Sequence, residues 1–99
     1  MEYLIRTADG VGPLLVHRDR FADVLDPKGF GTWIAPDPHD GDFRLVLGPA
    51  EAVFYAEDVG WHVVIEGEFP ASSSDELVRT VALQLEHATG ARTTWIRLI

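Results

Sequence analysis

The stretch that decides the fold spans residues 61–98 and reads WHVVIEGEFPASSSDELVRTVALQLEHATGARTTWIRL. It opens with alternating apolar residues. This period of two predicts a strand over 61–69, because successive side chains of a strand point to opposite faces. Residues 93–98 alternate again and predict a closing strand, with Trp95 and Ile96 on opposite faces. Between these two strands the apolar residues recur at the spacing of a helix, so at least one helix joins them.

The middle of this stretch predicts a helix over 73–89. Ser73 and Glu76 have the spacing of a capping box at its start, and Gly90 stands where a left-handed residue ends many helices. A single amphipathic helix needs a sheet on which to bury its apolar stripe, so we expect it to pack on one face of a sheet. The stripe consists of Leu77, Val78, Val81, Ala82, Leu85 and Ala88.

Upstream of residue 61 the sequence predicts further short strands, over 3–7, 32–35, 43–47 and 52–57. Residues 14–30 are compatible with either a strand or a short helix. The connections after residue 43 are short, which favours antiparallel pairing of consecutive strands. We therefore expect a single α+β domain over residues 1–99, with a mainly antiparallel sheet of five or six strands and one long helix in the C-terminal half, packed on one face.

The composition narrows the possible functions. Sixteen acidic residues against eight basic ones give a formal charge of -8, which disfavours nucleic acids and anionic membranes and favours a basic partner. The absence of cysteine excludes disulfides, thiol catalysis and zinc–thiolate sites. The N-terminus lacks a signal-peptide pattern and no apolar run is long enough to span a membrane, so we expect a cytoplasmic protein.

The face of the sheet opposite the helix is the candidate site. On the strand over 61–69, His62, Glu66 and Glu68 should form a row at intervals of about 7 Å. Among the three tryptophans, Trp33 is the one expected to be exposed, while the others build the core. The residues expected to bind a partner are Trp33, Tyr55, Glu57, Asp58, His62, Glu66 and Glu68.

No cofactor or metal is expected. The acidic loop over 36–42 carries possible oxygen ligands, but the spacing of a calcium loop is only partly met and its prolines and glycine favour a turn. Those possible ligands are Asp37, His39, Asp40 and Asp42.

The sequence favours a non-enzymatic module that binds a basic protein. Small size, acidity and the lack of an assembled catalytic set are typical of bacterial immunity proteins and antitoxins, a likeness of profile rather than of sequence. In that hypothesis the acids attract a cationic surface, and Trp33 or Tyr55 fills the buried centre.

Two alternatives stay open. The first is a small enzyme or ligand-binding domain with a pocket between the sheet and residues 14–30, in which His62 and Glu66 act as general base or as metal ligands. The second is a structural homodimer formed through an apolar edge strand.

Overall fold

The computed structural model describes residues 1–36 and 41–99. Within these residues one sheet has the order β2-β3-β4-β5-β1-β6, and every neighbouring pair is antiparallel. Its six strands are β1 (Glu2–Thr7), β2 (Trp33–Ile34), β3 (Phe43–Leu47), β4 (Ala50–Glu57), β5 (Gly60–Glu66) and β6 (Thr93–Arg97). A 3-10 turn, η1 (Arg18–Arg20), leads into α1 (Phe21–Leu25), and the long helix is α2 (Ala71–Thr89). The predicted α+β class is confirmed.

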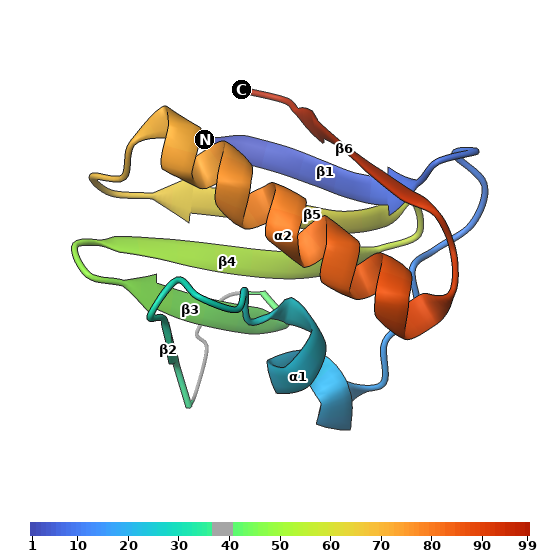
Figure 1. Ribbon diagram of the computed structural model, residues 1–99, viewed down its shortest axis with the longest axis horizontal. Helices are drawn as coiled ribbons and strands as arrows, with labels where there is room; N and C mark the ends of the chain where they lie inside the picture. Colours follow the sequence, from blue (N-terminus) through green and yellow to red (C-terminus); the bar gives the residue numbers. More distant parts are fainter. Residues whose placement is uncertain (37–40) are drawn as a thin grey trace.

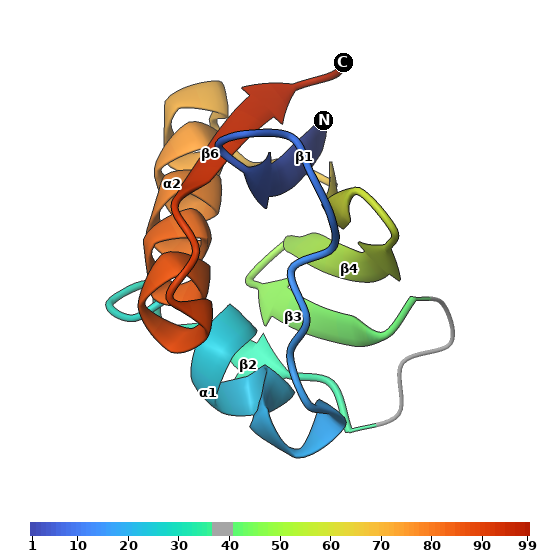
Figure 2. The same cartoon turned by 90° about the vertical axis from the view of Figure 1, so that its right-hand side faces the viewer.

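Both helices lie on the same face of the sheet. Figure 1 shows α2 running obliquely across the strands with α1 beside it, and the view turned by 90° separates a helical layer from a sheet layer (Figure 2). Buried and partly exposed residues alternate along β1 and β3, because only one face of each strand meets the helices. The centre of the core is built from Tyr3, Ile5, Leu45, Phe54, Trp61, Val63, Leu77, Val81 and Leu85.

Helix α2 buries the predicted stripe, but it begins earlier than predicted. Pro70 precedes its first residue, and the Pro70 carbonyl accepts the hydrogen bond of the Ser74 amide at 2.9 Å. Ser73 and Glu76 consequently lie inside the helix, and no side chain caps its start. The capping-box prediction is therefore wrong, because proline at the N-cap already sets an extended entry into the helix. At the other end Gly90 adopts the predicted left-handed conformation, with φ 76°.

Several strand boundaries differ from the predicted ones, and the largest difference is at the end of β5. Strand β5 ends at Glu66, because Gly67 turns the chain with φ +96°, and a Cβ there would lie 2.6 Å from the Pro49 carbonyl oxygen. Phe69 returns to pack against the core from the connection that follows rather than from the strand. In the N-terminal third the helical alternative is the one adopted, as η1 and α1. The loop residues Asp37, His39 and Asp40 lie outside the described part of the chain.

Helix α1 is attached to α2 through one glutamine. The Gln84 amide nitrogen donates to the carbonyl oxygens of Val24 and Asp26, both at 2.9 Å. Its side-chain oxygen accepts from the Lys28 backbone amide at 3.0 Å. These three bonds satisfy the end of α1, which at five residues is too short to be stable alone.

Candidate functional site: the open face of the sheet

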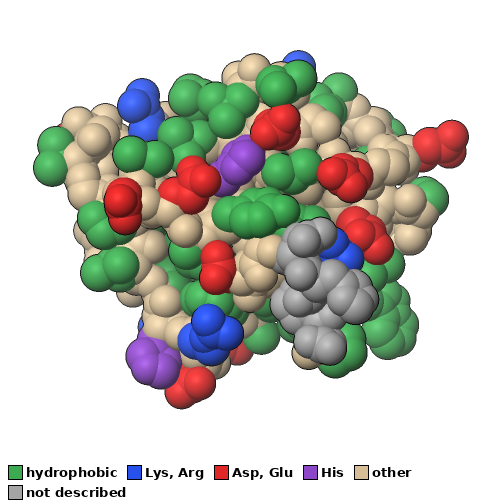
Figure 3. All heavy atoms as spheres, turned by 180° about the vertical axis from the view of Figure 1, so that it is seen from behind, with side chains coloured by type: hydrophobic (Ala, Val, Ile, Leu, Met, Phe, Trp, Pro, Cys, Tyr) green, Lys and Arg blue, Asp and Glu red, His purple; other side chains and the backbone are tan. Residues whose placement is uncertain are grey.

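The face of the sheet turned away from α1 and α2 is covered by no helix among residues 1–36 and 41–99. We call it the open face. In the view from behind, acidic side chains are spread over this face around a hydrophobic centre (Figure 3). The strand register assigns to it Glu2, Leu4, Arg6, Arg44, Val46, Glu51, Val53, Tyr55, Glu57, His62, Val64, Glu66, Thr94 and Ile96.

His62 lies at the middle of the open face between two carboxylates. Its Nε2 is 2.9 Å from Glu2 Oε1, and its Nδ1 is 3.9 Å from Glu57 Oε2. Tyr55 is directly opposite on β4, with the two rings tilted by 34° and their centres 5.8 Å apart. The structure thus brings together three of the predicted site residues and adds Glu2, which sequence reasoning missed. Glu2 precedes the predicted first strand, and only the pairing of β1 with β5 carries it to His62.

Glu66 belongs to a second group on the same face. It lies directly opposite Glu51, which lies opposite Val46, which in turn lies opposite Trp33. These four residues form one row across four strands, so Trp33 and Glu66 are roughly 14 Å apart along the sheet. Arg44 offsets one of the two facing carboxylates, with Nη1 3.5 Å from Glu51 Oε2. Elsewhere in the described chain no cation lies within ion-pair distance of Glu66.

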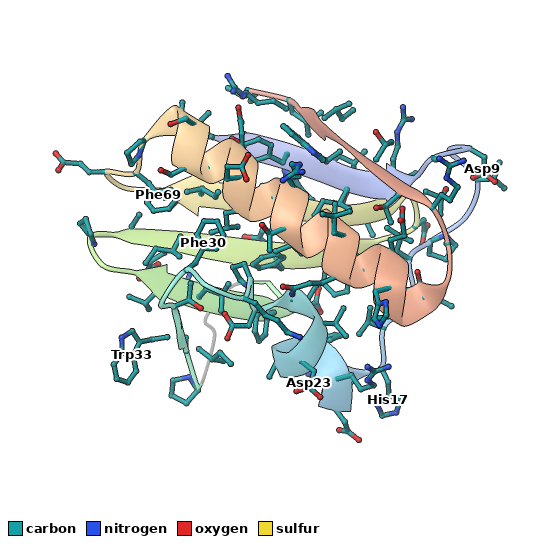
Figure 4. The ribbon with its side chains drawn as sticks, in the orientation of Figure 1. Asp9, His17, Asp23, Phe30, Trp33 and Phe69 are labelled. Atoms are coloured by element: carbon teal, nitrogen blue, oxygen red, sulfur yellow. The ribbon has the colours of Figure 1, made fainter. Side chains whose placement is uncertain are left out.

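Trp33 is exposed, as predicted. Its relative accessibility is 73%, whereas Trp61 is buried at 1%. The Trp61 ring nitrogen donates to the Leu14 carbonyl at 2.9 Å, and Trp95 packs edge-on against Tyr3. Figure 4 shows Trp33 projecting from β2, which is the edge strand on the opposite side of the sheet from β6.

The remaining predicted residues are not gathered with the others. Asp58 lies in the turn between β4 and β5, and Glu68 lies in the connection from β5 to α2. Both are exposed, but they stand beyond opposite ends of β5. The predicted row of His62, Glu66 and Glu68 is therefore wrong at its last member, because the chain leaves the sheet at Gly67.

A surface groove lies on the opposite side of the molecule. It occupies about 580 Å³ between α1 and the C-terminal half of α2, and its walls include Asp23, Lys28, Leu83 and His87. Figure 4 labels Asp23 on this side. His62 does not line it. The space between the sheet and residues 14–30, where a pocket was expected, is filled by Leu14, Val24 and Leu25, which are buried.

A polar cluster beside the N-terminus of α2 has perturbed ionisation. The Tyr3 hydroxyl donates to Asp75 Oδ1 at 2.7 Å, and Arg97 Nη2 donates to Asp75 Oδ2 at 2.6 Å. Burial, followed by the bond to Asp75, raises the pKa of Tyr3 to about 12. The bonds from Tyr3 and Arg97 hold the pKa of Asp75 below its usual value. At neutral pH the cluster joins α2, β1 and β6 through an ionised carboxylate.

The chemistry available on the open face is recognition through charge and aromatic contact. In the described part of the chain no three His, Asp or Glu side chains are placed to hold a metal ion. None of the helices there combines the length and the apolar character needed to cross a bilayer. Comparison with models of protein families, with curated proteins and with solved structures finds no match to this chain.

Proposed function

We propose that this chain is a protein-interaction module whose open face binds a basic partner protein, in the manner of a small acidic immunity protein or antitoxin. The observation that carries the proposal is a sheet face that no helix of the described chain covers, on which carboxylates surround an aromatic and apolar centre. Interfaces of this kind combine an apolar centre, which supplies affinity, with charges that select and steer the partner.

The centre of the open face offers contact area without needing to be reorganised. Tyr55 and Val64 lie on adjacent strands and are partly exposed, and the Tyr55 ring lies against His62 at a tilt of 34°. A tyrosine fixed in this way loses little conformational entropy when a partner covers it. An apolar or planar cationic side chain of the partner, such as arginine, fits against such a ring.

The rim supplies the negative potential. Glu57 and Glu66 stand on neighbouring strands at opposite ends of the face, and Glu51 faces Glu66 directly. Two facing carboxylates with one nearby arginine repel each other, and a cation from a partner relieves that repulsion. With a net charge of -8 behind them, these groups accelerate association with a basic surface at low salt.

Trp33 adds an anchor at one end. Tryptophan is enriched at the residues that dominate binding energy, and this one is 73% exposed on a two-residue edge strand in the same row as Glu66. A partner that contacts Tyr55 and Trp33 together covers the face from β4 to its β2 edge.

Two charge-reversal variants test the proposal. Glu57→Lys with Glu66→Lys alters the open face, whereas Asp19→Lys with Asp23→Lys makes the same change of net charge at exposed positions on the helical side. The tagged proteins are used to capture partners from the native lysate at low salt, with elution by stepwise increases in salt. We expect one basic protein to be retained by the wild type and by the helical-side variant, and lost by the open-face variant. Equal loss from both variants, or no retained protein, would contradict the proposal.

A second candidate function is acid–base chemistry at His62. It is favoured by the 2.9 Å contact with Glu2, which could orient the ring as a general base. Substitution of His62 by glutamine separates the two functions. Catalysis would be abolished, whereas binding of a basic partner would lose less than about tenfold in affinity, since His62 is not one of the carboxylates that attract a basic partner.

A further inference from the structure

Among residues 1–36 and 41–99, strand β6 has a neighbouring strand on one side only, β1, and Figure 1 shows no helix or strand beyond it. The direction of its backbone groups follows from the pairing with β1. The Ala8 amide donates to the Arg92 carbonyl at 2.8 Å, and the Leu98 amide donates to the Glu2 carbonyl at 2.7 Å. Residues alternate in an antiparallel ladder, so the even-numbered residues of β6 bond to β1. The backbone groups of Thr93, Trp95 and Arg97 therefore point outward from the sheet.

Only one of the outward amides has a partner in the described chain. The Thr93 amide donates to the Glu86 side chain at 2.9 Å. The backbone groups of Trp95 and Arg97 on this side meet no described residue. The strand is five residues long and contains no proline, whereas the edge strand at the other side of the sheet, β2, has only two residues. Unpaired N–H and C=O groups along a strand edge form a template on which the strand of another chain can pair.

We propose that β6 pairs antiparallel with β6 of a second copy of this chain. The two-fold axis would pass between the Ile96 residues of the two copies. Residues whose backbone groups point outward must face each other across the new pair, because only they can exchange hydrogen bonds. Two registers near the middle of β6 meet this condition. A register centred on Trp95 needs the Thr93 amide, which Glu86 already occupies. The register centred on Ile96 uses only the outward backbone groups of Trp95 and Arg97. Each Trp95 then faces Arg97 of the other copy, and each such pair exchanges two backbone hydrogen bonds.

The side chains suit this register. Ile96 lies on the open face, 38% exposed, and would face Ile96 of the second copy. On the helical face the Trp95 ring would lie beside the Arg97 guanidinium of the second copy, an arrangement that permits a cation–π contact. Arg97 is never opposite Arg97, and β6 contains no acidic residue. The strand is thus complementary to itself, which a two-fold interface requires.

This pairing has the opposite salt dependence to that of the proposed function. Two copies that each carry a charge of -8 repel each other, and salt screens that repulsion, so dimerisation should strengthen as salt rises. Binding of a basic partner by the open face should weaken under the same change. Failure of one proposal is therefore distinguishable from failure of the other.

Cysteine cross-linking tests the register directly, because the natural chain has no cysteine. Facing residues of a non-hydrogen-bonded pair have Cα atoms about 4.5 Å apart, within reach of a disulfide. Ile96→Cys should therefore form a covalent dimer under mild oxidation. Thr94→Cys is the matched control on the same face, because its counterpart in the second copy lies four residues out of register, at roughly 13 Å. Cross-linking of Thr94→Cys alone, or of the two variants only when mixed, would overturn the register.

Analytical ultracentrifugation tests the dimer itself. Ile96→Lys places two like charges directly across the axis and should raise the dimer dissociation constant by at least about tenfold. Leu83→Lys makes an equivalent change at an exposed residue of α2 and should leave the dimer dissociation constant unaltered. Circular dichroism confirms that both variants fold. A wild-type chain that stays monomeric at every concentration and salt level would overturn the proposal, as would a dimer that Ile96→Lys does not weaken.

Discussion

Substitution of Gln84 tests how α1 is held to the rest of the protein. Gln84→Met keeps the length of the side chain and its helix propensity but removes all three hydrogen bonds to the end of α1. A neutral hydrogen bond contributes about 1 kcal/mol net, so the three together set an upper value of about 3 kcal/mol. Gln84 is only half-buried, and the released backbone groups can bind water. We therefore expect a loss of roughly 1–2 kcal/mol in the free energy of unfolding.

Gln84→Glu supplies a second comparison with a definite sign. Glutamate keeps an acceptor for the Lys28 amide but places a charged oxygen beside the Val24 and Asp26 carbonyls, which the amide nitrogen now contacts at 2.9 Å. Two acceptors facing each other repel, so the glutamate variant should be less stable than the methionine variant.

Urea unfolding followed by circular dichroism measures both effects. At about 4–8 °C per kcal/mol for a domain of this size, the methionine variant should also melt roughly 5–15 °C lower than the wild type. Hydrogen exchange at the Lys28 amide should accelerate by a larger factor than exchange in the sheet, because α1 is released first. The role assigned to Gln84 would be refuted if the unfolding free energy of the methionine variant lay within 0.3 kcal/mol of the wild-type value, which is about the scatter of such measurements. It would also be refuted if the glutamate variant were more stable than the methionine variant.

Three further predictions concern the cluster of Tyr3 with Asp75 and the glycines at the turns of the sheet. Tyr3→Phe should cost about 1–2 kcal/mol, because it removes a bond to an ionised carboxylate. Since the pKa of Tyr3 is raised to about 12, its contribution is complete below pH 10 and is lost as the pH rises towards 12, which tyrosinate absorbance and unfolding at alkaline pH will report. The pKa of Asp75 is lowered, so its contribution is lost as the pH falls below the usual carboxyl value, and Asp75→Asn should flatten the acid limb of the stability curve. Gly60→Ala should prevent stable folding, because the new Cβ would lie 2.0 Å from the Ile5 carbonyl oxygen, whereas Gly48→Ala, with φ +69° and nothing within 4 Å, should cost only about 1–2 kcal/mol. Similar losses for the two alanine variants in thermal melts would show that the crowding at Gly60 is unimportant.

The parts of the fold that sequence patterns predict correctly are those governed by local rules. The apolar period of α2 and the left-handed Gly90 depend on residues within a few positions of one another. The start of α2 escaped prediction because Pro70 and the serines both suit a helix entry, and the chain enters the helix at Pro70. Strand β5 was predicted too long because Gly67 preserves the alternation while its backbone leaves the sheet.

In the candidate site too, features set by neighbouring residues were predictable, whereas contacts between distant residues were not. The exposure of Trp33 was predicted from its place beside the proline-rich loop, and Tyr55 was chosen because it lies on the strand expected to neighbour that of His62. The contact between Glu2 and His62 joins residues 60 positions apart in the chain, and no periodicity encodes the insertion of β1 beside β5. Glu68 was included for the converse reason: its alternation with Glu66 is visible in the sequence, but the turn that separates them depends on close approach to Pro49 and Ala50.

The position of β1 has a consequence for biosynthesis. Ile5 pairs with Trp61 on one side and with Trp95 on the other, so the strand of this sheet that is synthesised first is flanked by the two that are synthesised last. Strands β3, β4 and β5 can form a meander as they emerge, but β1 remains without a neighbour until most of the chain has been synthesised. Contacts between such distant residues slow folding, because a long loop must close before any of them forms. Nascent chains should therefore expose the apolar side of β1 until β5 has been synthesised, and chaperones that bind short apolar segments would act on β1 before the other strands of this sheet.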